Sequence, residues 1–267
     1  MPAVDVGGGI SLYYELYDFT EPWKAGPPPL LFLHGLGGDR RMWLYQVPAF
    51  CGRYPTLVVD LRGHGRSSHP RADFTATDMA RDVLRLTRVL GIERAHVVGL
   101  SMGGVVAQQL AMDFPPVIAS LTLCDTFASI PPELENLARE TLLWIAEHDM
   151  AEVARTRIRA AFSDHVEPAM CEYWIEQVAK NDKASYERAA RATFSFSAGP
   201  RLAQLAVPAL VLVGAEDRVT PPPLSHDLAA RIPGARFVEI PRAGHISNAE
   251  NPSAFNQALA EFLSSVG

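Results

Sequence analysis

The residues best suited to covalent chemistry form a Gly-x-Ser-x-Gly sequence centred on Ser101. An apolar stretch, residues 95–98, precedes this sequence, and residues compatible with a helix follow it at once. A serine hydroxyl becomes a useful nucleophile when a sharp turn between a strand and a helix holds it in the open beside a base. Gly99 and Gly103 provide the small neighbours that such a turn needs. Because the pattern is short, a glycine-rich turn without a catalytic role is the alternative.

A base and an acid occur further along the chain, in the order serine, acid, base. Asp217 follows the apolar run 207–214, and His245 follows a glycine after the predicted strand 236–240. His245 would take the proton of Ser101, and Asp217 would orient the imidazole ring. Asp125 also comes directly after an apolar run and is the alternative acid.

A second glycine-rich loop, residues 34–38, follows the apolar run 30–33. We expect the backbone N–H groups of Leu36 and Met102 to form an oxyanion hole. The glycines beside Leu36 would let its N–H group approach a substrate, and Met102 begins a helix, where an N–H group has no partner within the helix. We expect His34 to brace this loop, and we include it with Gly35 among the residues that could line a substrate pocket.

The elements that must position these residues alternate along the chain. Gly7–Gly9 predict a hairpin that joins residues 3–6 to a strand over 10–17. Further apolar or β-branched runs predict strands over 30–34, 56–60, 95–98, 120–124, 207–214 and 236–240. Helical spacing predicts helices over 41–50, 78–90, 224–231 and 253–263, and one from Met102 to a point before Pro115. This alternation indicates an α/β protein with a parallel sheet covered on both faces.

Five unusual loops, residues 34–38, 60–68, 99–104, 214–220 and 241–245, each follow a predicted strand. Ligands bind at the carboxyl ends of the strands in such sheets, so we expect these loops to converge on one edge.

The segment 127–205 lacks buried-strand patterns and contains amphipathic helical patterns instead. We therefore expect residues 1–126 and 206–267 to form a core domain, and residues 127–205 to form an inserted helical cap, or lid.

Composition restricts the class of partner. The formal net charge of −6 argues against nucleic acid, whose backbone requires clustered Lys and Arg. The cysteines, Cys51, Cys124 and Cys171, are sparse and indicate reduced thiols. The first residues show no basic or apolar signal-peptide pattern, and the longest apolar run is too short for a membrane span. We expect a cytoplasmic protein that does not bind membranes; the oligomeric state is not indicated.

Taken together, the motifs resemble those of α/β hydrolases over nearly the whole chain. Within that superfamily, the sequence Asp-Leu-Arg-Gly-His-Gly-Arg-Ser-Ser at 60–68, Leu-Cys-Asp-Thr at 123–126 and Gly-His-Ile-Ser-Asn-Ala-Glu-Asn-Pro at 244–252 most resemble the 3-oxoadipate enol-lactonase branch and its neighbours, the small bacterial carboxylesterases. The resemblance implies a mostly parallel eight-stranded sheet flanked by helices, with an inserted helical lid. It also implies a triad of Ser101, Asp217 and His245, no metal or organic cofactor, and a small-molecule ester or lactone as substrate.

Two further functions use the same fold. Carbon–carbon bond hydrolysis or perhydrolysis would keep the triad and change the substrate, whereas a non-catalytic ligand receptor would use the fold alone. An enol-lactonase must hold a carboxylate, which predicts a cation facing the site. Arg139 is the candidate, with a surface position as the alternative, and we include Trp144 and Val219 among the residues that could line the pocket.

Overall fold

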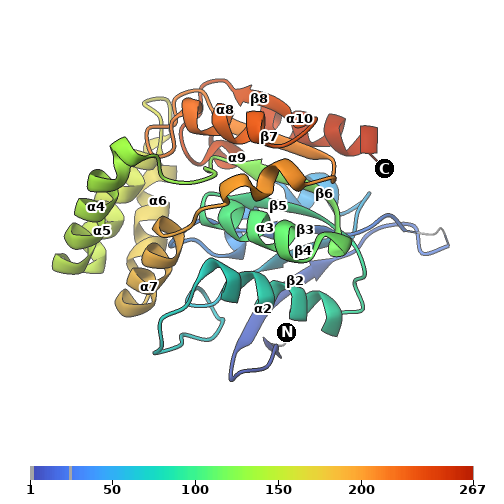
Figure 1. Cartoon of the computed structure of the whole chain (residues 1–267), viewed down its shortest axis with the longest axis horizontal. Coiled ribbons are helices and arrows are strands. Elements are labelled where there is room, and N and C mark those ends of the chain that lie inside the picture. Colours follow the sequence, from blue (N-terminus) through green and yellow to red (C-terminus); the bar gives the residue numbers. More distant parts are fainter. Residues whose placement is uncertain (1–2, 24–25, 267) are drawn as a thin grey trace.

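The computed structural model describes residues 3–23 and 26–266, and an eight-stranded sheet runs through its centre (Figure 1). Met1 and Pro2, on which part of the signal-peptide expectation rests, lie outside the described residues. The strand order is β1-β2-β4-β3-β5-β6-β7-β8. The strands are β1 (Ala3–Asp5), β2 (Ser11–Tyr17), β3 (Leu30–Leu33), β4 (Thr56–Val59), β5 (Ala95–Leu100), β6 (Ile118–Cys124), β7 (Ala209–Gly214) and β8 (Arg236–Ile240).

The sheet is parallel from β4 to β8, whereas β1 and β2 form a hairpin and β2 pairs antiparallel with β4. Every residue of β3 to β7 is buried, as their largely apolar runs predict for strands covered on both faces. The predicted α/β class and the mostly parallel eight-stranded sheet are therefore confirmed.

Two layers of helices cover the sheet. One face packs against α2 (Ala76–Val89), α3 (Met102–Asp113) and α8 (Pro222–Arg231). The other face packs against the short helix α1 (Val47–Phe50), α10 (Pro252–Val266) and the 3-10 helix η1 (Arg40–Trp43). Short helical segments η2 (Pro115–Val117) and α9 (Ser247–Glu250) complete this part of the chain.

The helix predicted over 41–50 is wrong. Residues 40–43 form the 3-10 helix η1, and α1 begins only at Val47. Pro48 explains the break, because proline has no N–H to donate to Leu44 and its ring clashes with the carbonyl of that residue. Proline is accepted in the first turn of α1, where an N–H would have no partner within the helix.

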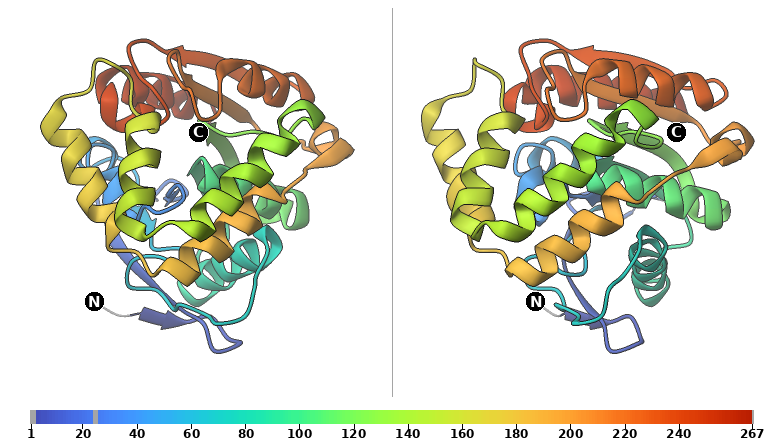
Figure 2. Two further views of the ribbon diagram at one scale, coloured as in Figure 1. Left: turned by 90° about the vertical axis from the view of Figure 1, so that its left-hand side faces the viewer. Right: turned by 60° about the vertical axis from the view of Figure 1, so that its left-hand side comes forward.

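Helices follow one another between β6 and β7, and Figure 1 shows the longer ones gathered at one end of the molecule. They are η3 (Pro132–Leu134), α4 (Glu135–Glu147), α5 (Met150–Ala161), α6 (Pro168–Ala179), α7 (Lys183–Phe194) and η4 (Gly199–Gln204). Figure 2 faces that end and shows the yellow-green to orange helices lying across the front of the core. Among the described residues, no helix combines the length and apolar character that a membrane crossing needs.

Candidate active site

Ser101 occupies the single residue between β5 and α3, with a φ of 53° and a ψ of −115°. A serine rarely adopts this backbone conformation, and the surrounding structure must hold it there. Glycine is required on both sides of the turn. A Cβ on Gly99 would lie 2.3 Å from the Gly103 carbonyl oxygen, and one on Gly103 would lie 2.0 Å from that of Leu33. The turn therefore exposes the Ser101 hydroxyl beyond the end of the sheet.

Ser101, His245 and Asp217 form a continuous hydrogen-bonded chain. His245 Nε2 lies 2.9 Å from Ser101 Oγ, and His245 Nδ1 lies 2.8 Å from Asp217 Oδ2. Asp217 also accepts hydrogen bonds from the N–H groups of Val219 (2.8 Å) and Thr220 (2.9 Å), and from the Thr220 hydroxyl (2.7 Å). These contacts fix the carboxylate, which in turn orients the imidazole toward the serine.

Burial by itself would raise the pKa of Asp217, but the facing charge of His245 and the hydrogen bonds from His245 and Thr220 hold that pKa below its ordinary value. The carboxylate is therefore ionised at neutral pH. A buried negative charge at this position stabilises the imidazolium that forms when His245 takes a proton from Ser101.

Asp125, the alternative acid, has different partners. Its carboxyl group accepts the N–H of Gly214 (2.8 Å) and lies 2.6 Å from the Ser247 hydroxyl oxygen. Among the described residues, it makes no hydrogen bond to His245. The geometry therefore favours Asp217 as the partner of the histidine.

The backbone N–H groups of Leu36 and Met102 donate no hydrogen bond to another group within residues 3–23 and 26–266. Gly35, Leu36 and Ser101 line one common cavity, so the loop that carries Leu36 lies beside the nucleophile. A Cβ on Gly35 would lie 3.4 Å from the Ser101 Cβ, which shows how closely the two segments approach. An oxyanion that develops next to the nucleophile requires backbone N–H donors of this kind.

Two buried histidines hold this loop. His34 Nε2 accepts the N–H of Leu61 (2.9 Å), and His64 Nε2 accepts the N–H of Gly37 (3.1 Å). Burial lowers the pKa of both rings, that of His64 to about 3 with a further contribution from His34. Both rings are therefore neutral at physiological pH, and each has a lone pair with which to accept its backbone partner.

A cavity of about 270 Å³ lies over Ser101 and His245. The core contributes residues such as Gly35, Leu36 and Val219, and the inserted helices contribute the opposite wall, most of it apolar. No Asp or Glu occurs among the described residues that line it.

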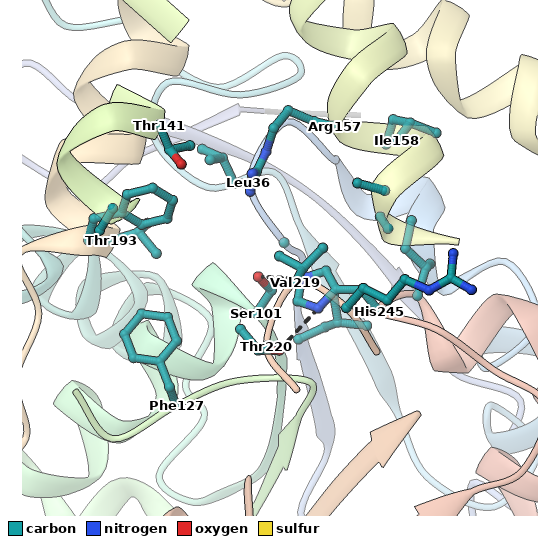
Figure 3. A pocket seen from close by; sticks show the side chains of 18 of the residues that line it. Leu36, Ser101, Phe127, Thr141, Arg157, Ile158, Thr193, Val219, Thr220 and His245 are labelled. Atoms are coloured by element: carbon teal, nitrogen blue, oxygen red, sulfur yellow. Dashed lines mark hydrogen bonds between the residues drawn. The ribbon is translucent and has the colours of Figure 1, made fainter. Parts of the chain in front are cut away.

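Arg157 of α5 is half-buried and reaches into this cavity toward Leu36 (Figure 3). In the part of the chain that the structure describes, no carboxylate forms an ion pair with it. The buried Tyr186 is its polar neighbour. The other arginine of the lining, Arg218, donates two hydrogen bonds to Asp164 (3.1 and 2.8 Å), so its charge is already balanced. Arg157 is thus an available cation in an otherwise largely apolar cavity.

The structure places three of the predicted pocket residues elsewhere. The last residue of η3, Leu134, and the residues Leu137, Ala138 and Thr141 of α4 face the cavity. Arg139, one position after Ala138, points away from the cavity, is exposed and donates a hydrogen bond to Asn136. Trp144 stacks on His148. His34 lies beneath its loop and is fully buried, so it supports the pocket without lining it. Gly35 and Val219 do line the cavity.

Arg157 was missed, although the sequence contains a signal for it. Val153, Ala154, Ile158 and Ala161 form the buried stripe of α5, and position 157 lies on the same face at helical spacing. A charged residue on an apolar stripe is unusual and indicates either a buried partner or a ligand site.

This chain is similar in sequence and in structure to known hydrolases. A family model described as "alpha/beta hydrolase fold" matches residues 28–252. The 3-oxoadipate enol-lactonase 2 of Acinetobacter baylyi is 31% identical over 239 residues, covering 88% of each chain. Among solved structures, the enol-lactonase from Burkholderia xenovorans LB400 has a TM-score of 0.89 at 31% identity and covers 98% of this chain and 100% of its own. A thermophilic esterase from Thermogutta terrifontis has a TM-score of 0.87 at 30% identity, covering 99% and 97%.

Proposed function

We propose that this chain, which belongs to the α/β-hydrolase fold family, is a serine hydrolase that cleaves a carboxylic ester or lactone. The relatives named above are hydrolases. The observation that carries the proposal is the chain of hydrogen bonds from Ser101 through His245 to Asp217, whose first two members line a cavity together with Leu36. Enol-lactonase and esterase relatives support this substrate class.

The reaction would proceed through an acyl-enzyme. His245 accepts the Ser101 proton as the serine oxygen attacks the carbonyl carbon of the substrate. The N–H groups of Leu36 and Met102 stabilise the negative charge that develops on the carbonyl oxygen. The tetrahedral intermediate then collapses, and His245 donates the proton to the departing alkoxide. A water molecule, deprotonated by His245, hydrolyses the ester bond to Ser101 in the same way.

We propose further that the substrate carries a carboxylate. Arg157 offers a guanidinium without an ion-pair partner among the described residues, and its fork of N–H donors matches a carboxylate. An unpaired charge in a largely apolar cavity is costly, and binding an anion removes that cost. The absence of acidic residues from the described lining leaves the cation unopposed.

Residues 127–205 act in this proposal as a lid over a core made of residues 1–126 and 206–267. Their helices supply one wall of the cavity and also carry Arg157. Substrate selection would therefore depend on the lid, whereas the chemistry depends on loops of the core.

Labelling with a fluorophosphonate tests the nucleophile directly. We expect the intact mass to increase by one adduct on the wild-type protein, and peptide mapping to locate the adduct on Ser101. Hydrolysis of p-nitrophenyl esters and of simple lactones would then be measured for the wild type and for Ser101→Ala. The variant should lose turnover by about 10⁴-fold or more, because the acyl-enzyme cannot form.

Ser120→Ala is a suitable control, since Ser120 is a buried serine of β6 that contacts His96 and lies away from the cavity. It should keep both labelling and turnover. A folded wild-type protein that resists the fluorophosphonate, or a Ser101→Ala variant that retains most of its esterase activity, would exclude the proposed mechanism.

A further inference from the structure

The short segment Cys124–Thr126, where β6 ends, contacts all three parts of the chain that carry Ser101, Asp217 and His245. Its first and last residues bind the nucleophile: the Ser101 N–H donates to the Cys124 carbonyl (2.9 Å), and the Thr126 hydroxyl donates to the Ser101 carbonyl (2.9 Å). The strained backbone of Ser101 is therefore held from both sides by neighbours of Asp125.

Asp125 itself connects the two remaining parts. Its Oδ1 accepts the N–H of Gly214, whose carbonyl in turn accepts the N–H of Asp217 (3.0 Å). Its Oδ2 lies 2.6 Å from the hydroxyl oxygen of Ser247, two residues after His245. One side chain thus bridges the loop of the acid and the loop of the base. These two loops also meet directly, since the Glu216 N–H donates to the Ala243 carbonyl (2.9 Å), but that contact does not include the nucleophile.

The surroundings of Asp125 favour an uncharged carboxyl group. The side chain is fully buried, and within the described residues no Lys, Arg or His forms an ion pair with it. Burial and the nearby charge of Asp217 raise its pKa well above the ordinary value. A protonated carboxyl group can accept the Gly214 N–H through one oxygen and share its proton with Ser247 through the other.

We propose that Asp125 is a positioning residue whose uncharged carboxyl group keeps the segments of Asp217 and His245 aligned with Ser101. The proposal rests on the serine hydrolase function proposed above. It assigns Asp125 a role distinct from that of an alternative acid, since Asp125 acts on the geometry of the triad and does not touch the substrate.

The matched variants are Asp125→Ala, Asp125→Asn and Ser247→Ala, with Ser120→Ala as the control for loss of a buried hydroxyl. Asparagine can replace both contacts, because its oxygen accepts from Gly214 and its amide group donates to Ser247. For each variant, kcat and KM on a neutral p-nitrophenyl ester, the rate of fluorophosphonate labelling, and the thermal unfolding midpoint would be measured.

We expect Asp125→Ala to lower kcat by about 10- to 100-fold and to change KM by less than about threefold, since a displacement of catalytic groups affects the transition state most. Asp125→Asn should recover most of that loss. Ser247→Ala, which removes one hydrogen bond, should lower kcat by about 3- to 10-fold. Labelling rates should follow kcat, and Ser120→Ala should stay near the wild type.

Three results would overturn the proposal: an unchanged kcat in Asp125→Ala, an equal loss of kcat in Asp125→Asn and Asp125→Ala, or an equal loss of kcat in Ser120→Ala and Ser247→Ala. Should Asp125→Ala fail to fold, Asp125→Asn and Ser247→Ala still decide the matter, since the former should be near the wild type and the latter slower. Labelling of the wild type tests the proposed function separately, so failure of the positioning role would leave the hydrolase proposal intact.

Discussion

Replacing Arg157 by Gln should reduce the preference of the protein for substrates that carry a carboxylate. The side chain reaches into the cavity and has no ion-pair partner among the described residues, so a bound carboxylate would supply its first counter-charge. Hydrogen bonds to charged groups contribute about 1.5–3 kcal/mol. This corresponds to a loss of roughly 10- to 150-fold in kcat/KM for a carboxylate-bearing substrate.

The assay compares pairs of substrates that differ only in the anion. One pair is the mono-p-nitrophenyl ester of a linear dicarboxylic acid and the ester of the monocarboxylic acid of equal chain length. Another is a γ-lactone with a carboxymethyl substituent and its neutral carboxamide. Spontaneous hydrolysis is subtracted, and kcat/KM is measured for the wild type, Arg157→Gln and Arg157→Lys. Lysine keeps the charge but loses the paired donors, so it should give an intermediate preference.

Arg218→Gln is the matched control, because it removes the same charge from the lining of the same cavity. Arg218 is already paired with Asp164 at the surface, and its loss should change the preference by less than about threefold. The reasoning would be refuted if Arg157→Gln lowered kcat/KM equally for the charged and neutral members of each pair. A wild-type protein without preference for either charged substrate would refute it as well.

Three further perturbations test other parts of the structure. Gly103→Ala should destabilise the fold by about 3 kcal/mol, because its Cβ would lie 2.0 Å from the Leu33 carbonyl oxygen; denaturant unfolding measures this, and wild-type stability would contradict the tight-turn argument. The pKa of His64 is about 3 in the folded protein, against an ordinary value of 6.5. Between these two pH values the unfolded chain binds more protons than the folded protein, so the free energy of unfolding falls as the pH drops through that range. Unfolding at about pH 7.5 and pH 5 should show a loss of about 2 kcal/mol from this group, absent in His64→Asn, and equal losses in both proteins would exclude the assignment. Asp217→Asn should lower kcat by about 10³- to 10⁴-fold with the fold intact, whereas a small effect would indicate that another group orients His245.

The sequence was most informative where local chemistry determines local structure. The largely apolar runs of β3 to β7 are long enough to identify buried strands, and the small residues around Ser101 identify a turn that other residue types cannot form. The order of Ser101, Asp217 and His245, each after a predicted strand, is by itself enough to predict that they lie on one edge of the sheet. The helix predicted over 41–50 is interrupted in the structure, because Pro48 cannot donate a hydrogen bond to Leu44.

The pocket could not be predicted in the same way. The lid helices α4 and α5 bury amphipathic stripes, and a stripe shows which residues face inward without showing what they face. Arg139 lies one residue position beyond Ala138 and is thereby directed away from the cavity, whereas Trp144 lies a turn beyond Thr141 and stacks on His148. The stripe of α5 places Arg157 on the inward face, but only the packing of α5 over the cavity shows that this residue faces the site.

By itself, therefore, the sequence determined the strands, the nucleophile turn and the order of the residues proposed for the triad, because each depends on steric and hydrogen-bonding properties of a few adjacent residues. Only the tertiary structure decided that Asp217, and not Asp125, contacts His245, and that Arg157 is the cation of the cavity. Both depend on distances of a few ångströms between segments far apart in the chain. Such distances are fixed by the packing of the whole molecule, so a local pattern such as the apolar stripe of α5 shows that a residue faces inward but not what it contacts.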